Sequence, residues 1–243
     1  MFKNIALIAR KPGLTRAEFI AYYEANHAPL AKRLFPQFTY YRRNFVDLNG
    51  AILSPGMTGP DFDSVTEIWF EDRAAREKML STHFSPDIQN AIEADERNFL
   101  DQSVTRMFTV DERGAKHTLD ELSPSKGLFK VIALLAIRPD LTKAQLIDYY
   151  ETRHAPLIWS KFPWIVEYRR NFIDLEGSIF APAAKPLDFD VITELWFKSR
   201  ADYQRMLDDH ANTDVGQIIA DDEANCFDRS KTRFFVVEER VSP

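Results

Sequence analysis

One internal repeat with a constant offset runs through almost the whole chain. The segment Tyr-Tyr-Glu-Ala-Asn-His-Ala-Pro-Leu at 22–30 returns at 149–157 as Tyr-Tyr-Glu-Thr-Arg-His-Ala-Pro-Leu, so that His27 and His154 stand 127 positions apart. Segments 41–45, 61–63, 67–70 and 95–96 return with the same offset at 168–172, 188–190, 194–197 and 222–223. A register kept through loops as well as elements indicates duplication of a complete domain, not a solenoid of short units.

Within each copy the apolar pattern predicts the order strand, helix, strand, strand, helix, strand. Thr15 and Glu18 have the spacing of a helix-starting capping box, and Pro29 is expected to stop or bend that helix. In the first copy we expect strands at 2–10, 38–48, 63–71 and 104–112, a second helical region at 72–99, and a loop at 54–60. The predicted domains are repeat 1 at 1–112, a linker at 113–127 and repeat 2 at 128–243.

The order βαββαβ is that of a ferredoxin-like α+β sandwich, in which both helices cover one face of an antiparallel sheet. The other face is left uncovered, and a tandem copy offers a partner at high effective concentration. We therefore predict that the two ferredoxin-like repeats pack together as a pseudo-dimer within one chain. The enclosed space between them, bordered by the Tyr-His helix, is the expected pocket. Assembly into a further homodimer is left open.

Charge and cysteine content narrow the partners and the location. The formal net charge is −6 and the basic residues are dispersed, so nucleic acid is not expected as a partner. No apolar run approaches the roughly 20 residues that span a bilayer, so no membrane partner is expected either. The one cysteine, Cys226, allows no intrachain disulfide and fits a reducing cytoplasmic location. The expected partner is a small hydrophobic molecule.

The tyrosine, histidine and proline of segment 22–30, together with Glu67-x-Trp69-Phe70, resemble the EthD family of dimeric α/β-barrel proteins. Both copies carry these motifs, and the resemblance covers nearly the whole chain apart from the linker. Members of that family are usually single domains that dimerise, so the resemblance implies a fused dimer. The wider superfamily includes cofactor-independent monooxygenases, isomerases, cyclases, dehydratases and decarboxylases, often acting on aromatic or polyketide-like molecules, and some haem-binding branches.

A tyrosine four residues before a histidine forms the candidate catalytic unit of each copy. Four residues make about one helical turn, so Tyr23 and His27 share a helix face. Imidazole accepts a proton near neutral pH, and a phenol donates to a developing oxyanion. The structural alternative is a half-buried histidine that bonds a carbonyl at the helix end. The candidate catalytic residues are His27, Tyr23, His154 and Tyr150, with Tyr22 and Tyr149 as candidate substrate-binding neighbours.

The predicted second and third strands carry further candidates for substrate binding. Alternation along a strand places Arg42 and Asn44 on one face and Arg43 on the other, so at least one arginine points inward or is paired. An inward arginine could hold a carboxylate or an enolate, whereas the structural alternative is a salt bridge to Glu67 or Asp63 on the adjacent strand. Glu67 shares a face with Trp69 and either carries a proton at a raised pKa or is structural. The candidates are Arg42, Asn44, Glu67 and Trp69, with Arg169, Asn171, Glu194 and Trp196 in the second copy.

Motifs for a metal or a bound nucleotide are not recognisable. The five histidines show no pairing at helical spacing, so no metal is expected, and there is neither a glycine-rich phosphate loop nor a Ser-His-Asp signature. We expect no cofactor. Haem ligation by one histidine is the alternative, which a Soret band would reveal. His83 and His210 correspond and are expected to face solvent.

Three functions are consistent with these residues. The first is a cofactor-independent lyase or isomerase, such as a dehydratase, decarboxylase or cyclase, acting on a hydrophobic aromatic or polyketide-like carbonyl compound. The second is a cofactor-independent monooxygenase of the same substrate class. The third is a non-catalytic, stress-associated protein that binds a small ligand. The copies differ at Asn26/Arg153, Lys32/Trp159, Tyr40/Glu167 and Phe99/Cys226, which predicts two similar pockets with different preferences.

Overall fold

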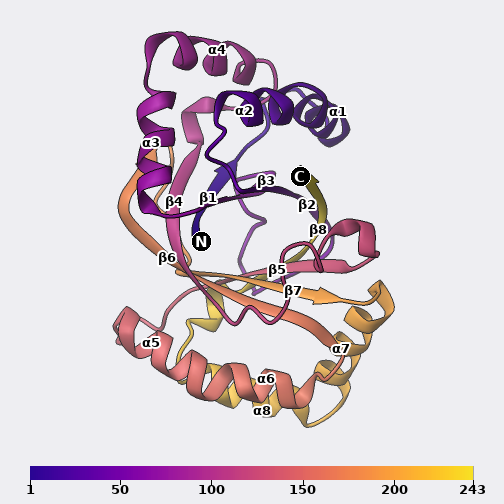
Figure 1. The fold of residues 1–243 in the computed structure, drawn as a ribbon. Coiled ribbons are helices and arrows are strands. Elements are labelled where there is room, and N and C mark those ends of the chain that lie inside the picture. Colours follow the sequence, from indigo (N-terminus) through magenta and orange to yellow (C-terminus); the bar gives the residue numbers. More distant parts are fainter. Residues whose placement is uncertain (243) are drawn as a thin grey trace.

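The computed structural model describes residues 1–242, whose strands form one closed barrel between two layers of helices (Figure 1). The first repeat supplies β1 (Phe2–Ile8), β2 (Tyr40–Leu53), β3 (Ser64–Phe70) and β4 (Arg106–Arg113). The second supplies β5 (Phe129–Leu135), β6 (Ile165–Phe180), β7 (Val191–Phe197) and β8 (Arg233–Ser242). The predicted α+β class and the pairing of two ferredoxin-like repeats are confirmed.

The two repeats are joined by hydrogen bonds between strand edges as well as by packing between their facing sheet surfaces. The barrel order is β1-β3-β2-β8-β5-β7-β6-β4, and every pair, including β4 with β1, is antiparallel. The strand pairs that join the repeats are β2 with β8 and β4 with β6. Closure leaves no free strand edge, which removes the exposed N–H and C=O groups of an open sheet.

The second strand of each repeat is longer than its sequence pattern predicts. We expected a strand ending near residue 48, but β2 runs to Leu53 after a shift of register between Asp47 and Ile52. Such an irregularity bends a strand and increases its twist. The bent end of β2 lies on the other repeat, where Ile52 pairs with Phe234.

A widened helical turn carries the Tyr-His motif of each repeat. In the first repeat α1 (Arg16–Tyr22) starts at the predicted capping box of Thr15 and Glu18, continues as a π-helical turn, η1 (Tyr23–His27), and ends as α2 (Ala28–Leu34). The helix therefore does not stop at Pro29, and an irregular turn precedes this residue instead. A proline ring collides with the carbonyl four residues earlier in an α-helix, and the widened turn, in which the Ala28 N–H bonds the Tyr23 carbonyl, relieves that collision.

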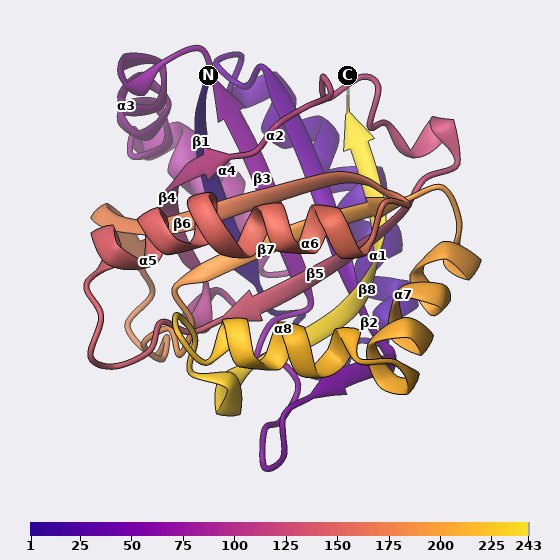
Figure 2. The ribbon, with the colours of Figure 1, turned by 90° about the horizontal axis from the view of Figure 1, so that it is seen from below.

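The other helices follow the same duplicated plan. The second repeat has α5 (Lys143–Tyr149), η4 (Tyr150–His154) and α6 (Ala155–Lys161). The second helical regions are α3 (Arg73–His83) and α4 (Pro86–Glu96) in the first repeat, and α7 (Arg200–Asn212) and α8 (Val215–Glu223) in the second. Figure 2 shows α5 to α8 lying across the outer face of the second repeat's strands. The helices therefore cover the outside of the barrel and leave its interior to the strands.

The linker between the repeats packs against one end of the barrel. It includes one 3-10 turn, η3 (Pro124–Lys126), and its Leu119 and Leu122 side chains are buried. Arg42 of β2 donates hydrogen bonds to the carbonyls of Leu119 and Leu122, and Arg169 of β6 donates to the carbonyl of His117 at 2.6 Å. The linker is thus held by one inward-facing arginine from each repeat.

Candidate functional site

Each repeat contains an apolar cavity between its own strands and its own helices. The cavity volumes are about 260 Å³ in the first repeat and about 240 Å³ in the second. These cavities lie outside the barrel, so the expectation of a pocket between the two sheets is wrong. The interior of the barrel is filled by side chains, because alternate residues of all the strands converge there. Among the lining residues of the first cavity are Ala6, Tyr23, His27, Tyr41, Thr66 and Met79, matched in the second by Ala133, Tyr150, His154, Tyr168, Thr193 and Met206.

The π-helical turn brings the predicted tyrosine and histidine to the cavity wall. Tyr23 and His27 are buried, and their ring centroids lie 5.0 Å apart in an edge-to-face arrangement. Tyr150 and His154 repeat this geometry at 4.9 Å. The structure therefore places both predicted residues of the unit together in each repeat, although the turn that holds them is not a regular α-helix.

A half-buried carboxylate orients each of these histidines. The Nδ1 atom of His27 lies 2.7 Å from Oδ2 of Asp95, and Nδ1 of His154 lies 2.7 Å from Oδ2 of Asp222. Burial raises the pKa of Asp222, but the hydrogen bond and charge of His154 outweigh it and hold that pKa below its usual value. Because Nδ1 of each histidine faces a carboxylate oxygen, we assign the proton to Nδ1, which leaves Nε2 as the basic nitrogen.

Both aspartates were missed as functional residues. Their only sequence signal is that Asp95 and Asp222 correspond between the copies, 68 residues after the histidine they contact. Tyr22 and Tyr149, predicted to bind substrate, instead donate hydrogen bonds to the second oxygen of the same aspartates, at 3.1 and 3.0 Å. Neither tyrosine is among the residues that line the cavities. Their place in the structure is to support the His-Asp pair.

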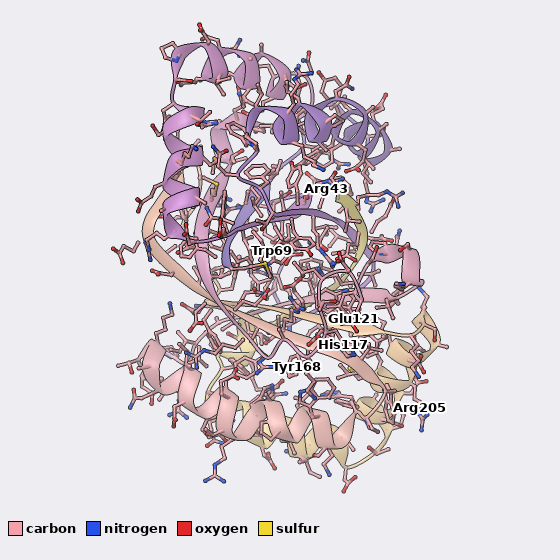
Figure 3. The ribbon with its side chains drawn as sticks, in the orientation of Figure 1. Arg43, Trp69, His117, Glu121, Tyr168 and Arg205 are labelled. Carbon is pink, nitrogen blue, oxygen red and sulfur yellow. The ribbon has the colours of Figure 1, made fainter. Side chains whose placement is uncertain are left out.

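A chain of hydroxyl groups forms the opposite part of each site. The Tyr150 hydroxyl lies 2.8 Å from the Tyr168 hydroxyl and 2.9 Å from Oγ1 of Thr193 (Figure 3 labels Tyr168). Tyr23 makes the same contacts with Tyr41 and Thr66, each at 3.0 Å. In the first repeat Ser64 extends the chain, with its hydroxyl 3.1 Å from Oγ1 of Thr66. Three hydroxyls joined by two hydrogen bonds, or four joined by three, leave one hydroxyl hydrogen for another acceptor.

Burial keeps these phenols protonated. It raises the pKa of Tyr23 to about 12, and it raises the pKa values of Tyr41, Tyr150 and Tyr168 as well. A phenol with a raised pKa is a hydrogen-bond donor at neutral pH and not a base. Tyr41 and Tyr168, which the sequence reading did not single out, are therefore candidate donors to a ligand oxygen.

The predicted substrate-binding residues of the strands lie inside the barrel, across the sheet from the cavities. This separates Arg42, Asn44, Glu67 and Trp69 from Tyr23 and His27, since alternate side chains of a strand point to opposite faces. Figure 3 labels Trp69 within the barrel. Arg169, Asn171, Glu194 and Trp196 occupy the equivalent interior positions and do not line the second cavity. Their prediction as one site with the Tyr-His unit does not match this geometry.

These interior residues belong to a network of balanced charges. Lys3 contacts Glu67 at 2.5 Å, Glu112 at 2.7 Å and Glu194 at 2.8 Å. Lys130 contacts Glu67, Glu194 and Glu239 at 3.0, 2.6 and 3.1 Å. Arg42 pairs with Glu239 at 2.9 Å, and Arg169 pairs with Glu112 at 3.1 Å and with Glu167 at 4.0 Å, so each of the four cations faces at least one carboxylate. Each lysine binds acids of both repeats.

The charged network has a structural role. Burial alone would raise the pKa of Glu194, but Lys130 and Lys3 hold it well below its usual value, whereas burial and Glu194 raise the pKa of Glu67. Asn44 and Asn171 donate to Glu67 and Glu194 at 2.8 Å. The structural alternative for these acids therefore has direct support. Arg42 and Arg169 do pair with acids on an adjacent strand, but these are Glu239 and Glu112 of the other repeat and not Glu67 or Asp63.

Each cavity is completed by the other repeat. Ile179 and Ala181, at the end of β6, line the first cavity, and Ile52 and Ser54, at the end of β2, line the second. His83 and His210, which were expected to face solvent, also line the cavities.

Among residues 1–242 no group of three or more His, Cys, Asp or Glu side chains could hold a metal ion. None of the helices in this part of the chain has the length and apolar character to cross a bilayer.

Solved structures with the same fold extend over nearly the whole chain. An anthrone oxidase-like protein superimposes with a TM-score of 0.55 at 8% identity, covering 99% of this chain and 92% of its own. A putative monooxygenase from Lactobacillus acidophilus gives 0.51 at 7% identity, covering 99% and 95%. A dye-decolorizing peroxidase from Bacteroides thetaiotaomicron gives 0.52 at 10% identity, covering 97% and 92%. At these identities the likeness establishes the fold alone.

Sequence comparison identifies the family. No curated protein matches the chain. The EthD domain model matches residues 11–103 and again residues 138–230, which confirms the resemblance of both copies. The chain therefore belongs to the EthD domain family, with two such domains joined in a pseudo-dimeric α/β-barrel.

Proposed function

We propose that the protein is a cofactor-independent acid-base enzyme that moves a proton on a small, hydrophobic carbonyl compound, in a lyase or isomerase step. The observation that carries this proposal is the histidine of each apolar cavity, whose Nδ1 atom is held 2.7 Å from an aspartate oxygen. A base oriented by a carboxylate at the wall of an apolar pocket is an arrangement suited to general base catalysis.

The chemistry follows from the two ends of the site. Nε2 of His27 or His154 takes a proton from a carbon next to the substrate carbonyl, and the adjacent aspartate stabilises the imidazolium. The electron pair moves onto the carbonyl oxygen, where the free hydroxyl hydrogen of the tyrosine chain is donated to the enolate. Return of the proton to another carbon completes an isomerisation, and loss of a leaving group from the enolate completes an elimination.

The second candidate is an oxygenase that uses the same base. An enolate formed in the cavity can reduce molecular oxygen, giving a hydroperoxide at carbon that loses water to leave a new carbonyl group. Two proteins with this fold, the anthrone oxidase-like protein and the putative monooxygenase, favour this candidate by the activities in their names. The two reactions differ in one measurable quantity, because only the oxygenase consumes oxygen.

Proton exchange in deuterium oxide tests the shared first step. With 2-tetralone and anthrone as probes, we expect the protons next to the carbonyl to exchange faster than without enzyme. Nuclear magnetic resonance measures the loss of their signal. His27→Ala and His154→Ala should each remove one site and leave activity from the other, and the double variant should lose about 10²-fold or more. His117→Ala, in the linker, is the control.

Four outcomes separate the hypotheses. Oxygen uptake with either probe assigns the oxygenase, and exchange without uptake assigns the lyase or isomerase. Complete loss from one single variant would contradict two independent sites. Ligand binding that survives in the double variant, with no exchange in the wild type, would leave a binding protein with structural histidines and would overturn the proposal.

A further inference from the structure

We infer that the two cavities select ligands of different charge: the second takes an apolar ring that bears a carboxylate or similar anionic group at its edge, and the first takes a neutral ring. This rests on the proposed function only in that both cavities bind small apolar molecules. The two linings agree at most positions, including the Tyr-His unit, the hydroxyl chain and Glu96/Glu223. Among residues that line them, formal charge differs only where Gln102 is replaced by Arg229.

The replacement changes the charge beside a shared glutamate. In the first cavity Gln102 donates to Oε2 of Glu96 at 2.9 Å, so this carboxylate has a neutral partner. In the second, Nε of Arg229 lies 3.0 Å from Oε2 of Glu223, so the carboxylate is balanced by a cation. An anionic ligand therefore meets an uncompensated negative charge in the first cavity and a neutral pair in the second.

Arg229 also has donors to spare. Within residues 1–242 its Nε atom is the one with a hydrogen-bond partner, and its side chain is 47% exposed, so the two Nη groups can reach a ligand. A guanidinium presents such groups in a planar fork that matches a carboxylate. Gln102 has a single amide nitrogen, which donates to Glu96 at 2.9 Å and to the Glu93 carbonyl at 3.4 Å, so both of its hydrogens are already used.

The backbone around Arg229 is held in place by the other repeat. Ser54, at the end of β2, donates its hydroxyl to the Arg229 carbonyl at 2.6 Å and lines the same cavity. The equivalent residue at the first cavity is Ala181, which has no hydroxyl. The 3-10 turn η5 (Arg229–Lys231) carries a second cation, Lys231, where the first repeat has Val104. Lys231 pairs with Asp228 at 3.4 Å and does not line the cavity.

Calorimetric titration with a matched pair of probes tests the inference. At neutral pH 2-naphthol is neutral and 2-naphthoate is an anion of similar size. We expect 2-naphthol to bind both cavities, and 2-naphthoate to bind the second about tenfold more tightly than the first, since a partly exposed charge-assisted contact is screened by water. Arg229→Gln should remove the tight 2-naphthoate site, and Gln102→Arg should create a second one. The double exchange should restore one, now in the first cavity.

A control variant and the salt dependence distinguish a direct contact between Arg229 and the ligand from a general effect of positive charge nearby. Lys231→Gln removes a cation from the same turn but not from the lining, so it should weaken 2-naphthoate less than twofold. Higher ionic strength should narrow the difference between the two cavities. If Arg229→Gln binds both probes as the wild type does, the inference is overturned and the proposed function stands. If neither probe binds the wild type, the cavities are not ligand sites and both proposals fail.

Discussion

At the scale of single residues, each histidine ring is held in one orientation by a hydrogen bond to an aspartate that is distant in sequence. Asp222 accepts from Nδ1 of His154 at one oxygen and from the Tyr149 hydroxyl at the other. The carboxylate is therefore fixed in position as well as charged, and the imidazole cannot turn its second nitrogen away from the cavity without losing that bond. The same three residue types make the same contacts in the first repeat, through Asp95.

Replacing Asp222 tests this coupling through pH. Because the pKa of Asp222 is lower in the folded protein, its contribution to stability is present above the unfolded pKa, about 3.9, and is lost as pH falls through the folded pKa. Asp222→Asn should lower the free energy of unfolding by about 1 to 2 kcal/mol at pH 7 and by less near pH 3. Urea unfolding at the two pH values measures the difference. Asp221→Asn, at the exposed neighbouring position, is the control, and an equal loss at both pH values would contradict the ionic contribution.

At the scale of elements, the π-helical turn decides where the histidine points. A regular α-helix turns by about 100° per residue, so one extra residue in a turn rotates everything after it by that angle relative to the preceding segment. Tyr23 and His27 then both reach the cavity while α1 and α2 keep their own buried faces, with Phe19 on the first and Ala31 on the second. Pro29 is the residue in the sequence that disfavours the regular alternative.

Pro29→Ala removes that restriction. We expect a regular α-helix to compete with the widened turn, so that His27 shifts away from Asp95 and proton exchange at the first cavity falls by about tenfold, with unfolding free energy changed by less than about 1 kcal/mol. The nitrogen-15 shifts of the His27 ring report the lost contact. Pro156→Ala should act in the same way on the second cavity, and Pro60→Ala, in a loop, is the control. Unchanged shifts would mean that packing alone maintains the turn.

At the scale of the whole molecule, the two repeats are joined by an apolar barrel core and by a buried network of charges at the end where the linker packs. Lys3 and Lys130 occupy equivalent positions, and each contacts Glu67 and Glu194. Buried charges are costly unless they are paired, so a correct pairing of the repeats satisfies all of them at once. The network therefore favours one register between the repeats over others.

Lys3→Met tests the network by leaving buried acids without their partner. We expect the free energy of unfolding to fall by about 3 to 5 kcal/mol, and Lys130→Met to give a similar loss because the site is symmetric. Lys126→Met, on an exposed linker position, should change it by less than about 0.5 kcal/mol. Chemical denaturation measures all three. A loss below about 1 kcal/mol for both buried lysines would contradict a network that holds the repeats together.

Several features of the fold could be predicted from the sequence because they depend on local or periodic patterns. The offset between His27 and His154 revealed the duplication, and strand and helix order followed from apolar spacing. The differences at Trp159 and Glu167 were also visible, but the structure gives them another meaning. Glu167 accepts from the backbone N–H groups of Lys116 and His117, and the Lys116 ammonium lies 3.2 Å from the centre of the Trp159 ring. These two residues dock the linker and line neither of the two cavities that contain the Tyr-His units.

The sequence by itself determined the repeat, the class of fold and the Tyr-His unit, since each depends on residues close together in the chain. Only the tertiary structure decided which face of each strand meets the helices. Alternation along a strand separates Tyr41 from Arg42 but does not say which side holds a cavity and which holds the charged network. It also decided that Asp95 reaches His27 and that Ile179 closes the first cavity, because contacts between distant segments follow from how helices and barrel strands pack, not from any local pattern.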